Sequence, residues 1–539
     1  MIRGSGCSLA ESRPLVAAGT RGTRSAARGG GELPPMGRLR NASRAPGGIL
    51  SPLSRLATLA SPLTPLTLSQ SWSVQRSSGV TAGTTRRSAQ PRPGWRGQVA
   101  PPAAAETWGH SSSCVVCGRA GAVGRSGGPA CRMGAVRVCS LLSALLLLGA
   151  SYYLYRPLPD SVAEPYKLMM LDAVLRTANH VATLGKLLRL VDPEVVLRNV
   201  VPRVPARSDA WVTVRDTELG GVRVRAFVSS HAAGLKRGVI YLHGGGWAYG
   251  TTQDVGNDHQ CREAARRLDA VVISVEYRLV PEHRFPVPLE DCLRATRHFL
   301  RHDTLAAFSV DPARVAISGD SAGGNLAVAV ALQLARESKE GSASLKLQAL
   351  IYPVLQALDF QTPSYRDNAH VPILYARTMV RMWLEYLGGD VALTDALLEN
   401  AHSRHVLLDP SGPGAFVDWR SLLPSRRPRG PEPPEGPARP DILAKIPALL
   451  DPRATPLLAD DDWLRLLPLT YVVTCEHDVL RDDGALLVAR LGPLGVPVQH
   501  QHLGDGFHGI LSLVQQPLLH FDIGVRTVDM YIAWLDEHL

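Results

Sequence analysis

The chain has 539 residues, of which 45% are hydrophobic and 20% charged, and its formal charge is +10. This apolar content supplies a large core and excludes a chain that is disordered throughout. Residues 1–137 hold 18 arginines and three glutamates, which gives that segment +15 and leaves −5 for the other 402 residues. The basic balance therefore does not indicate a nucleic-acid-binding domain, and we expect no nucleic-acid partner.

Residues 1–132 are predicted to be a disordered basic extension. The segment consists largely of Gly, Ala, Ser, Pro and Arg and has no apolar periodicity that could form a core. Met133 and Gly134 resemble a natural N-terminus of their own, so a translation start placed too far upstream is one interpretation of the extension.

Residues 133–156 are predicted to be a signal-anchor transmembrane helix. Residues 138–155 contain no charge, and 18 residues at a rise of ~1.5 Å span about 27 Å, close to the thickness of a bilayer core. No small-residue cleavage pattern follows, which favours an uncleaved anchor over a removed signal peptide. A buried core helix is the alternative, but it would begin a domain with no amphipathic partner before it. Arginines on the N-terminal side predict a single-pass type II topology, with everything after Arg156 in the lumen.

The cysteines are weak evidence for any site or disulfide. Cys114 and Cys117 lack the second ligand pair of a zinc finger, so we expect no metal site. Only Cys261, Cys292 and Cys475 fall in the part expected to fold, so at most one disulfide forms there.

The remainder predicts an α/β fold. Residues 157–210 have apolar residues at spacings of three and four, which predicts a helical N-terminal cap segment, and residues 211–228 form two β-branched runs around a Gly-Gly turn, a hairpin signal. Strands are then expected at 238–242, 270–277, 315–318, 347–353 and 469–474, with helices at 261–268, 289–300, 325–336 and 485–491. This alternation predicts a mostly parallel central sheet with helices on both faces and functional residues at the carboxyl ends of the strands.

A cap insertion interrupts this core. We predict core segments at 211–358 and 451–539, separated by residues 359–450, which include a helix at 376–387. The Pro- and Arg-rich stretches between 410 and 440 are expected to be a flexible, non-helical loop, because proline breaks helices.

The strand at 315–318 leads into a candidate nucleophile. The motif consists of Gly319, Asp320, Ser321, Ala322 and Gly323 and stands directly before a helix. A G-x-S-x-G sequence in this context is typical of a sharp turn that lifts a serine hydroxyl above the sheet edge. Ser321 is the predicted nucleophile.

The strand at 238–242 leads into a glycine-rich loop, formed by His243, Gly244, Gly245, Gly246 and Trp247. The amides of Gly244 and Gly245, with that of Ala322, are predicted to form an oxyanion hole. A phosphate-binding loop would need G-x-G-x-x-G or a trailing Gly-Lys-Ser/Thr, and neither is present. His243 is expected to be a structural residue of the loop rather than a base.

The acid and the base should follow in that order. Several carboxylates compete after the strand at 469–474, and spacing does not select one; Asp478, four residues past the strand, is preferred over Glu476, Asp482 and Asp483. His508 lies in a loop directly before Gly509, and it is the predicted base. His500 and His502 lie in a strand-like run and are expected to be pairing residues.

Together these motifs resemble the hormone-sensitive-lipase-like branch of α/β-hydrolases. The resemblance includes Glu276-Tyr277-Arg278-Leu279 and the D-V-L-R-D-D sequence from Asp478, and with the anchor it makes residues 133–539 similar to the arylacetamide deacetylase family. It implies a serine hydrolase of lipid esters, including cholesterol esters and acetyl monoalkylglycerol ethers, in the lumen of the endoplasmic reticulum. It also implies that Ser321 is the nucleophile, Asp478 the orienting acid and His508 the base, with no metal or organic cofactor.

Two other functions stay open at this point. An amidase or drug-ester deacetylase would use the same residues on other substrates. A catalytically inactive member of the fold would bind a small hydrophobic ligand, although such a protein normally lacks the serine or the histidine.

Overall fold

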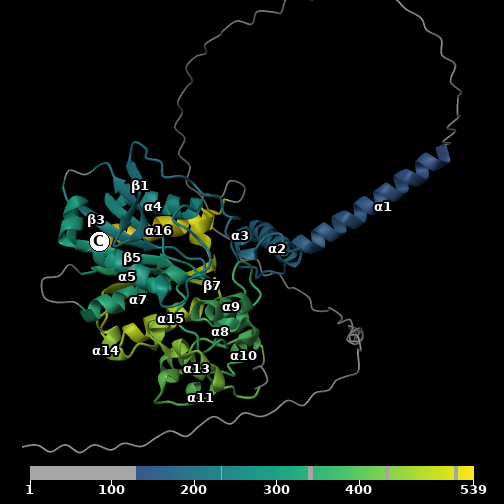
Figure 1. Cartoon of the computed structure of the whole chain (residues 1–539). Coiled ribbons are helices and arrows are strands. Elements are labelled where there is room, and N and C mark those ends of the chain that lie inside the picture. Colours follow the sequence, from purple (N-terminus) through teal and green to yellow (C-terminus); the bar gives the residue numbers. More distant parts are fainter. Residues whose placement is uncertain (1–128, 232–233, 338–343, 431–435, 515–519) are drawn as a thin grey trace, which may run out of the picture. The chain divides into compact units, whose positions relative to one another are not determined.

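The computed structural model describes residues 129–231, 234–337, 344–430, 436–514 and 520–539. Within these ranges, a sheet of eight strands has the order β1-β2-β4-β3-β5-β6-β7-β8 (Figure 1). The strands are β1 (Val212–Leu219), β2 (Val222–Ser229), β3 (Lys236–Leu242), β4 (Ala270–Val275), β5 (Val310–Asp320), β6 (Leu347–Ile351), β7 (Leu469–His477) and β8 (Val498–Phe507). Each core strand expected from an apolar run is present, and the polar run at 496–503 supplies most of β8.

The sheet is parallel from β4 to β8 and antiparallel at one edge. The neighbours β4-β3-β5-β6-β7-β8 all run parallel, whereas β2 is antiparallel to both β1 and β4. β1 and β2 form the expected hairpin, in which Gly220 and Gly221 have φ angles of 59° and 75°. A two-residue turn with two positive φ angles matches the twist of the strands that it joins. The predicted fold, a mostly parallel sheet with helices, is confirmed.

Side chains along each strand alternate between two cores, one on each face of the sheet. In β3, Ile240 and Leu242 pack in the first core, and Val239 and Tyr241 pack in the second. The first is covered by α5 (Val287–Phe299), α7 (Ala322–Glu337) and α15 (Arg481–Leu491), and the second by α4 (Val255–Leu268) and α16 (Asp522–His538). Helices on both faces explain why these strands are almost continuously apolar. The short helix α6 (His302–Ala307) leads into β5, and η5 (Ile510–Leu513) follows β8.

The segment between β6 and β7 forms a cap of short helices. Its elements are α8 (Pro363–Asp367), α9 (Ala376–Leu387), η1 (Val391–Leu393), α10 (Thr394–Leu398), α11 (Arg404–Leu407), η2 (Pro413–Val417), α12 (Trp419–Leu422), α13 (Asp441–Lys445), η3 (Pro447–Leu450), η4 (Pro456–Leu458) and α14 (Asp461–Leu464). α9 has the bounds expected from its amphipathic spacing, and its buried side chains include Met379, Trp383 and Tyr386.

The prediction that the Pro- and Arg-rich stretches between 410 and 440 are non-helical is wrong in the first stretch, 410–414. A 3-10 helix begins at Pro413 and α12 follows at Trp419. Proline lacks only an amide hydrogen that the first turn of a helix leaves unbonded anyway, so Pro413 starts this turn instead of breaking it. From 424 to 440, the described residues contain no helix, as expected.

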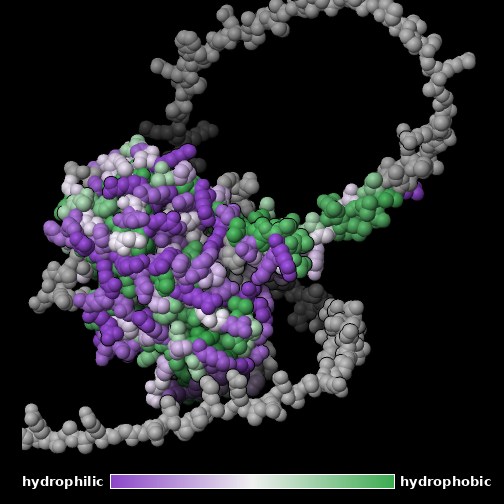
Figure 2. Space-filling view, in the orientation of Figure 1, coloured by the Kyte–Doolittle hydropathy of each residue, from purple (hydrophilic) through white to green (hydrophobic). Residues whose placement is uncertain are grey.

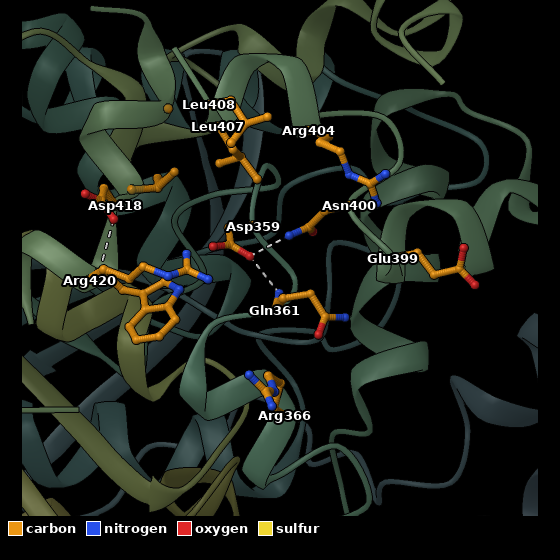
Figure 3. A pocket seen from close by; sticks show the side chains of 13 residues that line it. Asp359, Gln361, Arg366, Glu399, Asn400, Arg404, Leu407, Leu408, Asp418 and Arg420 are labelled. Carbon is orange, nitrogen blue, oxygen red and sulfur yellow. Dashed lines mark hydrogen bonds between the residues drawn. The ribbon is translucent and has the colours of Figure 1, made fainter. Parts of the chain in front are cut away.

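The cap contains a polar pocket of about 180 Å³ (Figure 3). At its wall, the buried carboxylate of Asp359 accepts hydrogen bonds of 2.7 Å from the side-chain amide of Asn400 and from the backbone amide of Gln361. None of the predicted site residues lines this pocket.

Within the described residues, which begin at Pro129, three helices precede the sheet. α1 (Pro129–Leu154) contains an apolar span, Arg137–Leu154, with a mean hydropathy of 1.5 and no buried residue. The helix begins four residues inside the segment predicted to be disordered, because Pro129 fits a first helical position and no second proline follows before the span. α2 (Pro165–Leu187) and α3 (Pro193–Leu197) confirm the helices expected between the span and the hairpin. The rest of the basic extension, with Cys114 and Cys117, lies outside the described residues.

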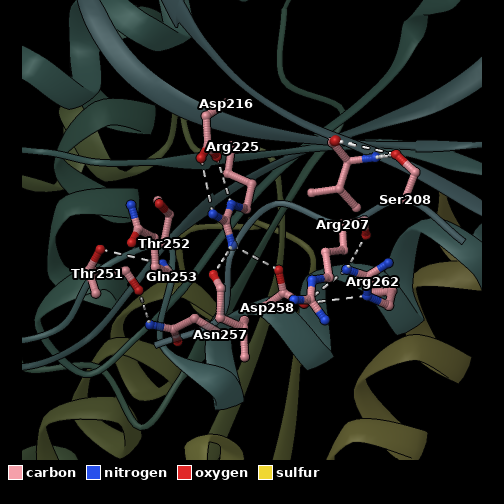
Figure 4. Close-up of polar contacts among 12 residues, drawn as sticks. Arg207, Ser208, Asp216, Arg225, Thr251, Thr252, Gln253, Asn257, Asp258 and Arg262 are labelled. Atoms are coloured by element: carbon pink, nitrogen blue, oxygen red, sulfur yellow. Dashed lines mark hydrogen bonds and ion pairs between the residues drawn. The ribbon is translucent and has the colours of Figure 1, made fainter. Parts of the chain in front are cut away.

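A buried arginine joins the hairpin to the helix behind it (Figure 4). The guanidinium of Arg225 on β2 lies 2.7 Å from Asp216 on β1 and 3.0 Å from Asp258 on α4, and it also donates to the carbonyl of Val204. A buried cation with three acceptors is stable where an unpaired one would not be.

Cys261, Cys292 and Cys475 are buried free thiols, so no disulfide forms among them.

Candidate active site

Ser321 stands at the sharp turn between β5 and α7. β5 ends at Asp320, α7 begins at Ala322, and Ser321 between them has a φ angle of 55°, in the left-handed region that side chains rarely adopt. A Cβ atom on Gly323 would overlap the carbonyl oxygen of Leu242, and one on Gly319 would overlap the backbone of Gly323. The two glycines are therefore required by the close approach of β3 and α7 to this turn.

The structure brings Ser321, His508 and Asp478 together from three separate segments. The Ser321 hydroxyl oxygen lies 2.9 Å from His508 Nε2, and His508 Nδ1 lies 2.8 Å from the carboxylate of Asp478. All three side chains are buried. A carboxylate only accepts hydrogen bonds, so Nδ1 carries the proton and Nε2 is free to accept the serine hydroxyl. Such an array can activate a hydroxyl as a nucleophile.

The other carboxylates near Asp478 have different partners. Glu476 faces Arg426, Arg481 and His502, and the His502 hydrogen bond together with Arg481 lowers the pKa of Glu476 to about 2. Asp482 pairs with Arg481, and Asp483 accepts hydrogen bonds from the Leu355 amide and the Gln356 side chain. Tertiary contacts thus separate four carboxylates that spacing alone leaves equivalent.

His500 and His502 lie on β8, as expected for pairing residues. Their ring nitrogens lie 2.8 and 3.0 Å from the hydroxyl of Thr474 on the neighbouring strand β7. The histidine that is hydrogen-bonded to Ser321 is His508, and not His500 or His502.

The glycine loop after β3 requires one correction. The amide of Gly244 donates a 2.8 Å hydrogen bond to the carboxylate of Asp320, so it is not available for an oxyanion. The amides of Gly245 and Gly246 donate no hydrogen bond to another described residue. Both glycines have positive φ angles, 115° and 59°, and a Cβ at Gly245 would overlap the carbonyl of Tyr249. The pair of amides open to a ligand is therefore one residue further along than predicted.

Asp320 and Tyr241 hold the base of this loop. The Tyr241 hydroxyl donates to Asp320 at 2.5 Å, on the carboxylate that accepts the Gly244 amide. Burial raises the pKa of Asp320, and these two hydrogen bonds oppose that shift. Tyr241 is not among the predicted site residues; its signal in the sequence is a tyrosine in a buried strand, whose hydroxyl needs a partner there.

His243 is enclosed by the loop rather than exposed to a substrate. Its ring stacks on Tyr277 with centroids 4.4 Å apart, and the Tyr277 hydroxyl donates to the His243 carbonyl at 2.7 Å. Glu276 next to it accepts hydrogen bonds from Thr251 and Thr252, beyond the loop. These contacts support a structural role for His243.

Cap and N-terminal segments also contact the site. Met382 of α9 lies against Gly246, where an added Cβ would overlap its sulfur atom. The ring of Tyr352, after β6, lies 4.8 Å from the His508 ring. On the other side, Ser161 Oγ lies 2.9 Å from His477 Nε2, and the Ala163 amide donates to the Asp505 carbonyl. His477 directly precedes Asp478, and Asp505 lies three residues before His508. The segment before α2 is therefore hydrogen-bonded to both loops that carry these site residues.

Comparison with known proteins agrees with this geometry. A family described as α/β hydrolase fold matches residues 239–411 and 442–512. Neutral cholesterol ester hydrolase 1 of Mus musculus is 45% identical over 409 residues, which cover 74% of this chain and 99% of the mouse protein. Arylacetamide deacetylase of Bos taurus is 44% identical over 405 residues, 74% of this chain and 98% of the bovine protein. The chain belongs to this α/β-hydrolase family.

Membership confirms the resemblance and the class of reaction. The hydrolase is a carboxylic ester hydrolase, in agreement with the enzymes to which it is similar. The identities to these two relatives, 45% and 44%, are nearly equal. A crystal structure of a mutant of esterase rPPE has a TM-score of 0.50 at 23% identity, covering 71% of this chain and 99% of that one, and it shows the same fold. The family match omits residues 412–441, which contain the second Pro- and Arg-rich stretch.

Proposed function

We propose that the hydrolase cleaves carboxylic esters of lipids at Ser321, through an acyl-enzyme, beside the membrane that anchors it. The observation that carries the proposal is the assembled Ser321–His508–Asp478 array, in a chain whose helix α1 contains an unburied apolar span. The proposed substrates are cholesterol esters and acetyl monoalkylglycerol ethers.

The acylation step follows from the hydrogen bonds of the array. His508 Nε2 accepts the Ser321 proton as the hydroxyl oxygen attacks the ester carbonyl. Asp478, hydrogen-bonded to Nδ1, holds the ring in place and stabilises the imidazolium that forms. The negative charge on the carbonyl oxygen is accepted by the amides of Gly245, Gly246 and Ala322, whose positions are fixed by the backbone. Collapse of this intermediate breaks the ester bond, and His508 gives its proton to the departing alcohol.

Deacylation repeats these steps with water. His508 removes a proton from a water molecule, whose oxygen attacks the acyl carbonyl on Ser321. The same amides hold the second oxyanion, and the proton then returns to Ser321 as the acid leaves. Every proton passes through His508, so each step depends on the geometry of one ring.

The apolar span and the relatives support a lipid substrate. An 18-residue span with no buried residue has the length of a bilayer core, and one mouse relative is named for hydrolysis of cholesterol esters. Lipid esters concentrate in membranes, so a tethered site meets them at a high effective concentration. We further propose that the helix is a type II anchor in the endoplasmic reticulum, with the catalytic domain in the lumen.

A deacetylase of arylacetamides and drug esters is the second candidate. It is favoured by the 44% identity to a bovine protein named arylacetamide deacetylase. The two candidates use the same array, so they are separated by substrates and not by active-site variants.

A substrate panel tests the proposal. Membrane fractions with the wild type and with Ser321→Ala are supplied with a cholesteryl ester, an acetyl monoalkylglycerol ether and an acetylated arylamine. We expect both lipid esters to be hydrolysed faster than the amide, and all hydrolysis to disappear in Ser321→Ala. A preference for the arylamide would contradict the lipid proposal and favour the second candidate.

An added glycosylation site tests the orientation. The sequence has no Asn-x-Ser/Thr after Arg156, and His302→Asn creates one at the exposed first residue of α6. We expect this variant to gain an endoglycosidase-sensitive mass, because only luminal chains are glycosylated. An unmodified variant that retains full ester hydrolysis would contradict a luminal catalytic domain.

A further inference from the structure

One face of α2 is apolar and exposed although the opposite face is already buried. Leu168 and Ala182 point into the protein. Large apolar side chains nevertheless follow one another at helical spacing on the outward side, at Met170, Val174, Val181, Leu184, Leu187 and Leu188, each more than half exposed. We call these six residues the α2 outer face. A helix that is apolar on both sides needs a second apolar environment.

The concentration of such residues is specific to this region. Eleven exposed large hydrophobic residues lie between Tyr166 and Val201, whereas the described residues from 202 to 539 contain five, which are scattered. Scattered surface leucines are normal, but a contiguous patch marks an interaction site. In Figure 2 the apolar surface over α2 continues toward α1.

The fold identifies the partner as a lipid bilayer. Ten residues separate the apolar span of α1 from the start of α2, and Arg176 of α2 donates to the carbonyl of Tyr153 at the end of α1. The same guanidinium lies 4.3 Å from the centre of the Tyr153 ring. A helix held to the end of a membrane span lies at the level of the headgroups. Tyr166, Lys186 and Arg189 are also exposed there, and such side chains place a polar tip in the headgroup region above an apolar stem.

α2 is also fixed to the active site. Ser161 and Ala163, just before it, contact the segments that lead to Asp478 and His508. The buried carboxylate of Asp172 on α2 accepts the Tyr375 hydroxyl, directly before cap helix α9. The position of the outer face relative to Ser321 is therefore set by hydrogen bonds to the loops of the site and to the start of cap helix α9.

We propose that the α2 outer face docks into the surface of the bilayer and presents the active site to esters that leave the membrane. The inference rests on the proposed membrane anchoring and adds to it: the anchor keeps the hydrolase at the membrane, and the outer face sets the orientation of its site. A hydrolase without the outer face stays anchored but meets membrane-held esters in the wrong orientation.

The experiment compares two matched triple variants of the full chain in phosphatidylcholine vesicles. One carries Leu184→Gln, Leu187→Gln and Leu188→Gln on the outer face. The control carries Leu235→Gln, Leu408→Gln and Leu466→Gln, three exposed leucines away from α2. Each is supplied with cholesteryl oleate held in the vesicles and with water-soluble p-nitrophenyl acetate.

We expect the outer-face variant to lose about tenfold in hydrolysis of cholesteryl oleate, since three leucines leave an apolar contact. Its rate on p-nitrophenyl acetate should stay within twofold of the wild type, which shows that it is folded, and the control variant should keep both rates. Equal rates for both variants on cholesteryl oleate, with wild type that floats with the vesicles, would overturn the docking surface but leave the anchor standing. Wild type that fails to float with the vesicles would overturn the anchor as well.

A second measurement does not depend on activity. Leu187→Trp places an indole on the outer face, and Leu408→Trp places one at an exposed site in the cap. We expect lipids brominated on their acyl chains to quench the added fluorescence of the first variant and not of the second. Equal quenching of the two variants would overturn the proposal.

Discussion

The carboxylate of Asp320 accepts the amide hydrogen of Gly244 at 2.8 Å, so the residue before Ser321 holds the glycine loop that follows β3. Tyr241 donates to the same carboxylate from the end of β3. The turn at Ser321 and the glycine loop after β3 are thereby joined by hydrogen bonds. With the Gly244 amide bound, the next two amides remain for the oxyanion.

This relationship predicts that Asp320 is a positioning residue for the oxyanion loop. Asp320→Ala should lower kcat by about 10²-fold per active site, the loss expected when one oxyanion donor is misplaced. KM for a short ester should change less than about threefold. Active sites are counted by fluorophosphonate titration, and Asp320→Asn, which keeps an acceptor oxygen, should recover part of the rate. If Asp320→Ala has fewer active sites but an unchanged kcat per active site, Asp320 supports folding only.

Asp478 and its neighbours provide a second prediction. Asp478→Asn should lower kcat by about 10⁴-fold, because an amide favours the wrong tautomer of the base. Glu476→Gln, two residues away and paired with arginines, is the matched control and should change kcat less than about threefold. Steady-state kinetics on p-nitrophenyl acetate measure both. Equal losses in the two variants would contradict the assignment of the acid.

Asp172 predicts how tightly α2 is held. Its buried carboxylate lies 2.7 Å from Arg176 and 2.5 Å from the Tyr375 hydroxyl. Tyr375→Phe removes one hydrogen bond and should weaken the docking of α2 by about 1 kcal/mol, so amides of α2 exchange hydrogen roughly fivefold faster. Hydrogen-exchange mass spectrometry measures this, with α5 as the internal reference. Unchanged exchange in α2 would mean that Asp172 does not fix the helix to the cap.

The buried Asp483 predicts a dependence of stability on pH. Burial raises its pKa to about 7, whereas an unfolded aspartate ionises near pH ~3.9. Between these values the folded state binds more protons, so the contribution of Asp483 to the free energy of unfolding falls as pH rises toward 7. The stability of Asp483→Asn relative to the wild type should therefore rise by about 3 kcal/mol between pH 5 and pH 8.

Chemical unfolding at the two pH values measures this difference. Asp303→Asn is the control, because the hydrogen bond with Arg301 lowers the pKa of the exposed Asp303 to about 2, and that carboxyl is ionised at both pH values. The control should show the same difference from wild type at pH 5 and pH 8. A pH-independent difference for Asp483→Asn as well would show that Asp483 is ionised in the folded state.

Motifs that directly follow a strand of the parallel sheet could be predicted from the sequence. Ser321 and the glycine loop each follow an apolar strand, and parallel strands bring their ends to one edge. The choice among Asp478, Asp482 and Asp483 could not be predicted from spacing, because distant residues, Leu355 and Ser364 among them, bind the others.

The predicted donor at Gly244 failed for a similar reason. Three consecutive glycines carry equivalent amides in the sequence, and only the position of Asp320 on another strand decides which amide is already bound. The turn at Pro413 could not be predicted either. Proline can end a helix or begin one, and the residues that surround it in space decide between the two.

The assignment of Ser321 is tested most directly by covalent labelling of the full-length hydrolase with a fluorophosphonate, followed by identification of the labelled peptide. We expect one label per chain on Ser321, a labelling rate that falls by about 10³-fold or more in His508→Ala, and no label in Ser321→Ala. Labelling of Ser321→Ala at the wild-type rate, or no labelling of the wild type, would contradict the assignment of Ser321 as the nucleophile of an ester hydrolase.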